Sequence, residues 1–561
     1  MSAKGILAML GLIAVIASIL LVIPTHKRGE LALEHVRVVN WNSVVDDPSR
    51  KLTISWMGIA AYPSARDGSW IQRRLEREFN IKLKPYFLDW GSFTNRRPMM
   101  FCGGDIPDVF WDGDPLGVRI NVKNGFVMEL PYKLLLKYCP IYVREVNAHG
   151  RQAWLYSYWR GKNWGIPTFV AMSGGETIPR AGVWRKDWLD KVGIKKVPDT
   201  VEEMHEAFRR FTFDDPDGDG ENDTYGYCPE VQWSLSFADV FAAYGILPAD
   251  FMVRDGEVVW GGTVPEAKNV LRVLRSWYKE GIIDPDYVAG DHVGGGPGQK
   301  FINGRVGYCY DQSEFSRLDL NTPQSIHSMT KALNPKAIIV PSKPLMGFDG
   351  KRRGRTWGGS AHVIQLGKHL EKEPRKVIRI LKMLEALTTN EALAREARMG
   401  KRDLHWEWSP DRGVYLLPPY NGATLANQEM LSNNSAESGG FFAPSSMPTA
   451  MSRQLLAQGV LEFRATYQRP EWGTMNVLGK SDVVDSASDY LEDLRQFQAT
   501  AFAEMIRGDR DLSYFDTFVK LWRQRGGDVL TREANEMYGT MQNIYRQVGV
   551  TSQPSAARGK R

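Results

Sequence analysis

The sequence predicts an α/β protein whose N-terminal part is built around a parallel sheet. Residues 51–57, 81–87 and 108–111 have the short apolar pattern of strands, and helical apolar spacing occurs between them at residues 69–79 and 93–102. Strands that alternate with helices in this way pair in parallel through crossover connections. The chain has 561 residues, which suggests roughly two to four domains rather than one.

The same alternation continues further along the chain. Thr200 and Glu203 form a capping box at the start of a helix, and a strand is expected soon afterwards at residues 225–228. Other strands are expected at residues 163–169, 182–184, 305–310, 336–341 and 361–366, and other helices at residues 185–192, 265–280, 374–388, 391–399, 486–508 and 513–545, the last interrupted at residues 523–528.

Composition and charge limit the partners and sites. The chain is 43% hydrophobic and 24% charged, and its net charge of +6 comes from 71 basic and 65 acidic residues. Basic runs are short, so no nucleic-acid partner is expected. The cysteines lack zinc-binding spacing, and one or two disulfides would be possible outside the cytoplasm. Spacing leaves their pairing open; they are Cys102, Cys139, Cys228 and Cys309.

The N-terminal segment indicates export. Residues 5–24 form an uncharged, mostly apolar run preceded only by Lys4. Such a run is typical of a signal peptide or of an uncleaved membrane anchor, and no A-x-A-like cleavage site stands out before Thr25. We therefore predict that residues 1–29 are a signal peptide or anchor, and that the protein is periplasmic or extracellular, free or tethered by residues 5–24.

The most specific motif is the loop D-P-D-G-D-G-E-N-D-T-Y-G at residues 215–226. Its carboxylates repel one another and its glycines favour tight turning, so it cannot be a packed strand or helix. Four of the carboxylates fall at positions 1, 3, 5 and 9 of an EF-hand-like calcium loop: Asp215, Asp217, Asp219 and Asp223. At position 12, Gly226 stands where an EF-hand has a bidentate Glu. The spacing predicts a Ca²⁺ site, against the alternative of a solvated acidic turn. The predicted ligands are Asp215, Asp217, Asp219, the Glu221 carbonyl and Asp223, with Thr224 as an extra oxygen.

Several short segments occur in the same order as in a known family, and their order is more specific than any one of them. With the acidic loop they span most of residues 50–400. The segments are GGDIPDVFW at residues 103–111, KNWGIP at 162–167, VWRKDWLDKVG at 183–193, YKEGIIDPD at 278–286 and FINGRVG at 301–307.

These segments are similar to those of the extracellular solute-binding proteins of family 1, the maltose-binding type of carbohydrate ABC importers. The similarity is greatest to the calcium-containing members that bind alginate-like oligosaccharides. The resemblance implies a two-lobed type II periplasmic-binding-protein fold, with an interlobe cleft that closes by a hinge motion and extra C-terminal helices. It also implies that the ion is structural and remote from the sugar. Lobe one is expected at residues 45–168 plus 357–405, lobe two at residues 173–350 plus 406–545, and a disordered tail at residues 546–561.

A sugar site needs flat aromatic faces for the rings and fixed polar groups for the hydroxyls. Trp111, Asp112 and Asp114 end the third predicted strand, where α/β proteins commonly bind ligands. For each aromatic residue a core position is about as good an explanation. The predicted ligand-binding residues are Trp56, Tyr62, Trp90, Trp111, Asp112, Asp114, Trp233, Tyr310, Asp311 and Trp357.

The sequence and its family resemblance therefore predict a monomeric binding protein that is not an enzyme. It would capture an oligosaccharide between its lobes and deliver it to ABC permease subunits in the membrane. The alternatives are a secreted carbohydrate-active enzyme, a membrane-anchored sugar sensor and a binding protein for a non-sugar ligand. A glycosidase would need two carboxylates roughly 5–10 Å apart, and the sequence has many carboxylates, so this alternative stays open. Motifs of other enzyme classes are absent from the sequence: there is no nucleophile elbow, metalloprotease helix or phosphate loop.

Overall fold

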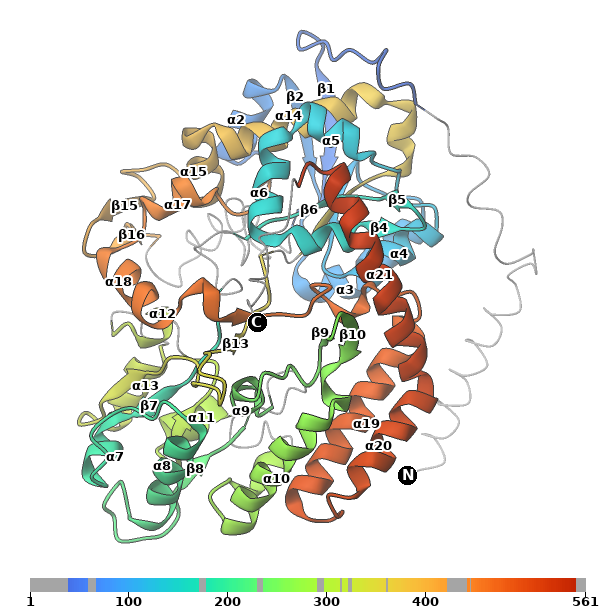
Figure 1. Ribbon diagram of the computed structural model, residues 1–561. Coiled ribbons are helices and arrows are strands. Elements are labelled where there is room, and N and C mark those ends of the chain that lie inside the picture. The colour runs from blue at the N-terminus through green and yellow to red at the C-terminus, as the bar shows by residue number, and fades with distance from the viewer. Residues whose placement is uncertain are drawn as a thin grey trace, which may run out of the picture.

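The computed structural model contains two α/β bodies and a helical C-terminal part (Figure 1). Tyr62, Trp233 and the apolar run at residues 5–24 lie outside the described residues, and the side chain of Trp90 is likewise not described. The structure describes residues 39–58, 67–170, 178–229, 236–289, 297–312, 315–320, 325–359, 362–420, 441–443 and 445–550.

The first body contains a five-stranded sheet with the order β2-β1-β3-β14-β6. Its first three strands are parallel, as the strand–helix alternation predicts, whereas β14 runs antiparallel to both of its neighbours. The strands are β1 (Leu52–Trp56), β2 (Ile81–Pro85), β3 (Val109–Asp112), β6 (Ile166–Pro167) and β14 (Val363–Leu366), and the first two connecting helices are α2 (Trp70–Glu78) and α3 (Trp90–Cys102).

Helices cover this sheet with apolar faces. In α14 (Pro374–Thr389), Val377, Ile380, Leu381 and Leu384 are at most 1% exposed, which is the 3.6-residue spacing of a core-facing stripe. Neighbouring elements of this body are α4 (Pro115–Lys123), α5 (Tyr132–Tyr138), α6 (Pro140–Gly150), the 3₁₀ turn η1 (Arg151–Leu155), β4 (Tyr158–Trp159), β5 (Lys162–Asn163), η5 (Lys368–Lys372) and α15 (Glu391–Met399).

The second body contains a four-stranded mixed sheet with the order β12-β7-β11-β8. An aromatic cluster fills its interior: the Trp184 ring lies 5.5 Å from Phe208 and 4.6 Å from Tyr308, centroid to centroid. Its elements are β7 (Val183–Arg185), α7 (Lys186–Lys191), α8 (Val201–Phe213), β8 (Tyr225–Tyr227), α9 (Ala238–Ala243), α10 (Pro265–Glu280), η4 (Pro285–Ala289), α11 (Pro297–Ile302), β11 (Val306–Cys309), α12 (Phe315–Leu318), α13 (Ile326–Leu333) and β12 (Ile339–Pro341).

Three segments of the chain cross between the two bodies, and these crossing segments lie side by side. The Arg180 N–H donates to the Arg355 carbonyl at 2.8 Å, and the Thr356 N–H donates to the Thr474 carbonyl at 2.8 Å. Strand β13 (Gly354–Arg355) pairs in parallel with β17 (Gly473–Thr474). Backbone hydrogen bonds therefore join all three crossings, which is a hinge arrangement.

Residues after 405 pack partly on the first body. Trp406 is 2% exposed and lies in a small apolar cluster with Ala394 of α15, Met447 and Leu455. This packing favours placing residues 406–420 and 445–455 with lobe one, whereas the predicted limits put them in lobe two; the lobe limits themselves stay a prediction. The elements are the hairpin β15 (Trp406–Ser409) and β16 (Gly413–Leu416), α17 (Thr449–Arg453), α18 (Gln458–Tyr467) and η6 (Pro470–Trp472).

The C-terminal helices confirm the predicted interruption. A five-residue π-helical segment, Arg523–Gly527, separates α20 from α21, and Gly526 there has φ of 116°. Helix α21 reaches Gln547 and Val548 is buried, so the tail predicted from residue 546 begins too early. The elements are β9 (Phe251–Arg254), β10 (Glu257–Trp260) and η3 (Gly261–Thr263), which pack nearby, and η7 (Ser481–Val483), α19 (Ala487–Arg507), α20 (Tyr514–Trp522) and α21 (Asp528–Gln547).

The four cysteines all lie in the described residues and form no disulfide with one another; Cys102 is exposed, and the other three are buried. Among the helices of the described residues, none is long and apolar enough to cross a membrane.

Candidate functional site

The acidic loop connects α8 to β8 on the second body, as predicted. At the start of α8 the Glu203 N–H donates to the Thr200 hydroxyl at 3.2 Å, while the Glu203 carboxylate accepts from the Asp199 N–H at 2.8 Å. The helix ends at Phe213, and Asp215 then takes a positive φ of 43°, which turns the chain sharply. The loop thus begins directly at the end of a helix anchored in the aromatic core.

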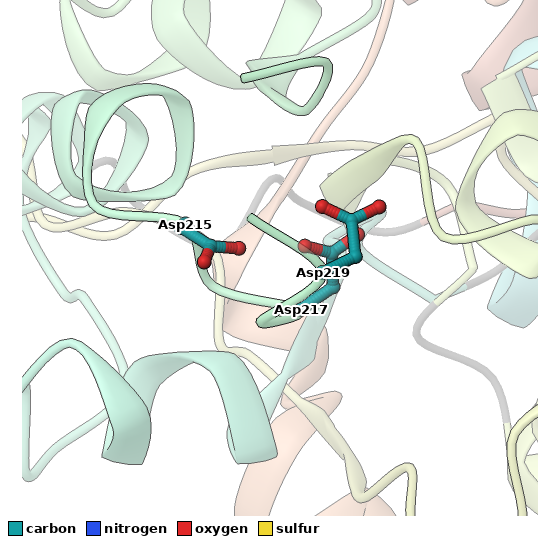
Figure 2. A group of neighbouring side chains, drawn as sticks. All are labelled: Asp215, Asp217 and Asp219. Carbon is teal, nitrogen blue, oxygen red and sulfur yellow. The ribbon is translucent and has the colours of Figure 1, made fainter. Parts of the chain in front are cut away.

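Three carboxylates gather in this loop. Oxygen atoms of Asp215, Asp217 and Asp219 all lie within 4.8 Å of one another, and Figure 2 shows the Asp215 carboxylate on one side of the turn and the other two on the opposite side. The Asp215 carboxylate accepts from the Gly218 and Gly220 N–H groups at 2.8 and 3.3 Å. Carboxylate oxygens at this separation are a donor set that a hard divalent cation fits.

Electrostatics support the same assignment. Burial raises the pKa of Asp217, and the shared hydrogen bond with Asp215 and the charges of Asp219 and Asp223 raise it further. Burial would also raise the pKa of Asp215, but two other effects lower this pKa overall. They are the hydrogen bonds that Asp215 makes with loop N–H groups and with Asp217, and the positive charge of Lys191. Like charges held this close cost stability unless a proton or a cation neutralises them.

The remaining predicted metal ligands differ in placement. Asp223 is close enough to raise the pKa of Asp217 but is not in the three-carboxylate group. Thr224 is 3% exposed and its hydroxyl donates to the Phe211 carbonyl at 2.7 Å, so it serves the core and not the loop. The Glu221 N–H donates to Asp219 at 2.8 Å, and its carbonyl oxygen stays a predicted ligand.

The aromatic candidates of the first body are buried. Trp56 is 1% exposed, and its indole N–H donates to the Phe441 carbonyl at 2.9 Å. Trp111 is 2% exposed, stacks on Phe93 at 4.6 Å and donates to the Gly58 carbonyl. The structure therefore favours the core interpretation for both tryptophans, because neither presents a ring face to solvent.

The polar candidates after β3 are fixed by neighbours. Asp112 is 2% exposed, forms an ion pair with Arg97 at 3.2 Å and accepts from Asn121 at 3.0 Å. Burial raises the pKa of Asp112. Asp114 caps α4 by accepting from the Gly117 N–H at 2.7 Å. Both carboxylates are thus oriented before any ligand arrives.

The candidates of the second body lie beside the hinge. Tyr310 is 1% exposed, and its hydroxyl has no hydrogen-bond partner among the described residues. Asp311 has φ of 62° and forms an ion pair with Arg180 at 2.9 Å. Trp357 is half-buried, and the Arg355 guanidinium lies 3.8 Å from its ring centroid. These three side chains mark a polar and aromatic region where the crossings meet lobe two.

Two residues that are not among the predicted site residues, Lys480 and His362, reach the end of β3. The Lys480 ammonium donates to the Gly113 carbonyl at 2.7 Å, across 367 residues of sequence. The His362 ring lies 4.4 Å from Trp111, and burial, together with the Lys480 charge, lowers the pKa of His362 to about 3. No local motif marks either residue, because only the fold brings these segments together.

Comparisons with known proteins agree with this architecture. No family model matches the chain. The chain is 24% identical to "Lipoprotein LipO" and 22% identical to "Polygalacturonan/rhamnogalacturonan-binding protein YtcQ", both of Bacillus subtilis (strain 168). The two alignments cover 85% and 88% of this chain and 90% and 92% of those proteins.

Solved structures show the same fold. The S. pneumoniae ABC-transporter substrate-binding protein FusA, in complex with kestose, has a TM-score of 0.60 at 17% identity. The alginate-binding protein AlgQ2, solved without calcium ion, has a TM-score of 0.57 at 16% identity. Both alignments cover 88% of this chain and 99% of the other. The fold that the resemblance implies is thereby confirmed: the chain has the two-lobed fold of these solute-binding proteins.

Proposed function

We propose that this chain is the extracytoplasmic binding component of an ABC importer and captures an oligosaccharide by closing its two lobes. The observation that carries the proposal is the hinge, in which Arg180, Arg355 and Thr474 lie on three adjacent crossings between two α/β bodies. Three crossings let one body rotate on the other while each core stays packed. The kestose ligand of FusA and the name of the polygalacturonan-binding relative support the sugar class.

The ligand would contact the polar and aromatic groups where strand ends meet the hinge. We assign this role to Asp114, Asp311 and Trp357, and we add Lys480 because it reaches the end of β3. Asp112 is left out of this set because it is as buried as Trp111. Arginine–carboxylate pairs such as Arg180–Asp311 hold both partners in fixed planes, which suits hydrogen bonding to neighbouring sugar hydroxyls. No covalent step is part of this proposal, and the sugar is released unchanged to the permease.

Calcium would serve as a structural ion in the acidic loop. Asp215, Asp217 and Asp219 would supply carboxylate oxygens, and Asp223 and the Glu221 carbonyl would complete the set. A bound ion removes the repulsion among these groups and joins the end of α8 to the start of β8. The similarity to AlgQ2 supports this choice of ion, because that structure is described as the protein without calcium ion.

An extracytoplasmic location fits the predicted export signal at residues 1–29. One relative is named a lipoprotein, which supports attachment near the membrane in that protein and by analogy here. The partner would be the permease subunits of the same importer, which receive the closed, loaded form.

A thermal-shift screen of the protein in calcium tests the proposal. Acidic and neutral oligosaccharides of equal length are compared, and the sugars are recovered afterwards to look for cleavage. Binding to the folded state raises the melting temperature by mass action. A dose-dependent rise with one sugar class and intact recovered sugar is expected. Cleaved sugar would establish the enzyme alternative, and no rise with any sugar would contradict the proposal.

A further inference from the structure

Helix α21 is attached to lobe two at its N-terminal end. Leu530 and Ala534 are fully buried, and the Asn535 side chain both accepts from the Val258 N–H at 2.9 Å and donates to the Val258 carbonyl at 2.8 Å. The Glu533 carboxylate accepts from the Ser486 N–H at 2.8 Å and from its hydroxyl at 2.6 Å. This end is therefore fixed to β10 and to the start of α19.

The same helix is attached to lobe one at its other end. The Asn147 side chain of α6 donates to the Val548 carbonyl at 2.9 Å, and its oxygen accepts from the Trp154 indole at 2.8 Å. Tyr545 is 4% exposed and lies under the Arg151 guanidinium, 5.6 Å from the ring centroid. Figure 1 shows α21 running from the lower body beside α19 and α20 up to the upper body.

The middle of α21 is packed more loosely than its ends. Between Ala534 and Met541 no residue is fully buried, although Met537 and Tyr538 are partly buried against the core. Gly539 is exposed, and apart from the backbone of its own helix no atom of the described residues lies within 4 Å of the position that an alanine Cβ would take there. A polar cavity of about 620 Å³ begins at Thr540, at the edge of this stretch, and extends along the C-terminal end of the helix to Gln547, opposite the turn at Gly161. Glycine in a helix interior weakens the helix relative to alanine, so this middle is the softest part of the helix.

We propose that α21 is a strut across the hinge, and that its flexible middle at Gly539 sets how easily the lobes move relative to each other. The helix is about 30 Å long at 1.5 Å per residue, so it spans the lobe boundary. Any change in the angle between the lobes must bend the strut or detach one end. Bending costs least at the loosely packed middle, because the space beside Gly539 is open. This inference rests on the proposed lobe closure.

Two opposite substitutions at one position test the strut. Gly539→Ala adds a methyl group into open space and stiffens the helix, and favours the lobe arrangement of this structure by up to about fivefold. Gly539→Pro removes an N–H and breaks the helix at its middle. The matched control is Gly298→Ala, because Gly298 also has open space but lies in α11, which packs within lobe two alone.

The measured quantity is the interlobe distance, determined by pulsed electron–electron double resonance in the absence of sugar. One spin label is attached to the exposed native Cys102 of lobe one and the other to Lys279→Cys on α10 of lobe two. The expected result is a narrower distance distribution with Gly539→Ala, a broader one with Gly539→Pro and no change with Gly298→Ala. Equal distributions in all three variants and the parent protein would overturn the strut.

A second arm separates this inference from the proposed function. Sugar binding is measured on the same variants by calorimetry. If the distances respond but no sugar binds, the strut stands and the sugar function fails. If sugar binds to all variants with the same affinity and the distances do not respond, the function stands and the strut fails.

Discussion

At the scale of single residues, Asp217 has the strongest functional signature. Its carboxylate lies within 4.8 Å of two others, and burial and like charges raise its pKa. Ionised carboxylates in this position destabilise the loop when no cation is bound, whereas the same oxygens are useful ligands when one is present. A neutral side chain at this position should therefore have opposite effects in the two conditions.

The first prediction concerns Asp217→Asn. In chelator this variant should melt at a higher temperature than the wild type, because it lacks the repelling charge. In calcium it should melt lower, because it lacks a charged ligand oxygen. Glu221→Gln is the matched control, since Glu221 is assigned through its backbone carbonyl and its side-chain change should leave the calcium response intact. If calcium raises the melting temperature of the wild type and of Asp217→Asn equally, Asp217 is not part of a calcium site.

The second prediction concerns pH. A raised pKa in the folded state means that the ionised Asp217 costs stability above that pKa, and the cost disappears as the pH falls through it. In chelator, the advantage of Asp217→Asn over the wild type should therefore shrink as the pH falls from neutral towards the acid range. The calcium-induced rise in melting temperature should shrink over the same range, because protons compete with the ion. Differential scanning calorimetry at several pH values measures both trends, and trends independent of pH would contradict the assignment.

At the scale of elements, the hinge is held by a buried ion pair. Arg355 on β13 and Asp250 lie 3.1 Å apart with both side chains 6% exposed, and Asn476 also donates to Asp250 at 3.2 Å. Burying the pair costs desolvation, so its net value is modest, but removing one partner leaves an unpaired buried charge. The pair therefore fixes the geometry where the crossings meet lobe two.

The third prediction follows from this pair. Arg355→Met should lower the free energy of unfolding by about 3–5 kcal/mol, because Asp250 is left buried and charged. The neighbouring pair Arg353–Asp349 is a matched control: its side chains are 22% and 48% exposed, so Arg353→Met should cost about 1 kcal/mol or less. Urea denaturation followed by tryptophan fluorescence measures both. Similar losses for the two variants would show that burial of the Arg355 pair is not what matters.

The elements that the sequence predicts best are those with local end signals. Helix α10 begins at Pro265 and ends before Gly281, which has φ of 86°, and both limits match the prediction. Helix α15 likewise has the predicted limits, with Asn390 as its cap. The short helices α4 to α6 are not predicted, since their caps and apolar faces are weak, and the antiparallel direction of β14 depends on distant pairing.

The contrast between local signals and distant contacts also explains which candidate sites can be predicted from the sequence. The acidic loop is predictable because its ligands are near neighbours in sequence, and their spacing alone sets the chemistry. The region near the hinge is not, because Lys480 reaches Gly113 from 367 residues away. Trp56 and Trp111 are plausible sugar platforms at strand ends by sequence, but whether a strand-end aromatic faces solvent or the core depends on packing that no local pattern contains.

At the scale of the whole molecule, two α/β bodies are joined by three hydrogen-bonded crossings and by helix α21. Closure on a ligand must therefore move both the crossings and the strut. The fourth prediction is that a bound oligosaccharide changes the angle between the lobes while each aromatic core keeps its packing, because close-packed interiors resist deformation and hinge backbones do not.

Closure of the lobes on a sugar is tested by the interlobe distance between labels on Cys102 and Lys279→Cys, measured while oligosaccharide is added in calcium. We expect a saturable, dose-dependent change in this distance with one class of oligosaccharide, and the same sugar recovered intact at the end. A distance that stays constant at every sugar concentration, or a sugar that is cleaved during the titration, would contradict it.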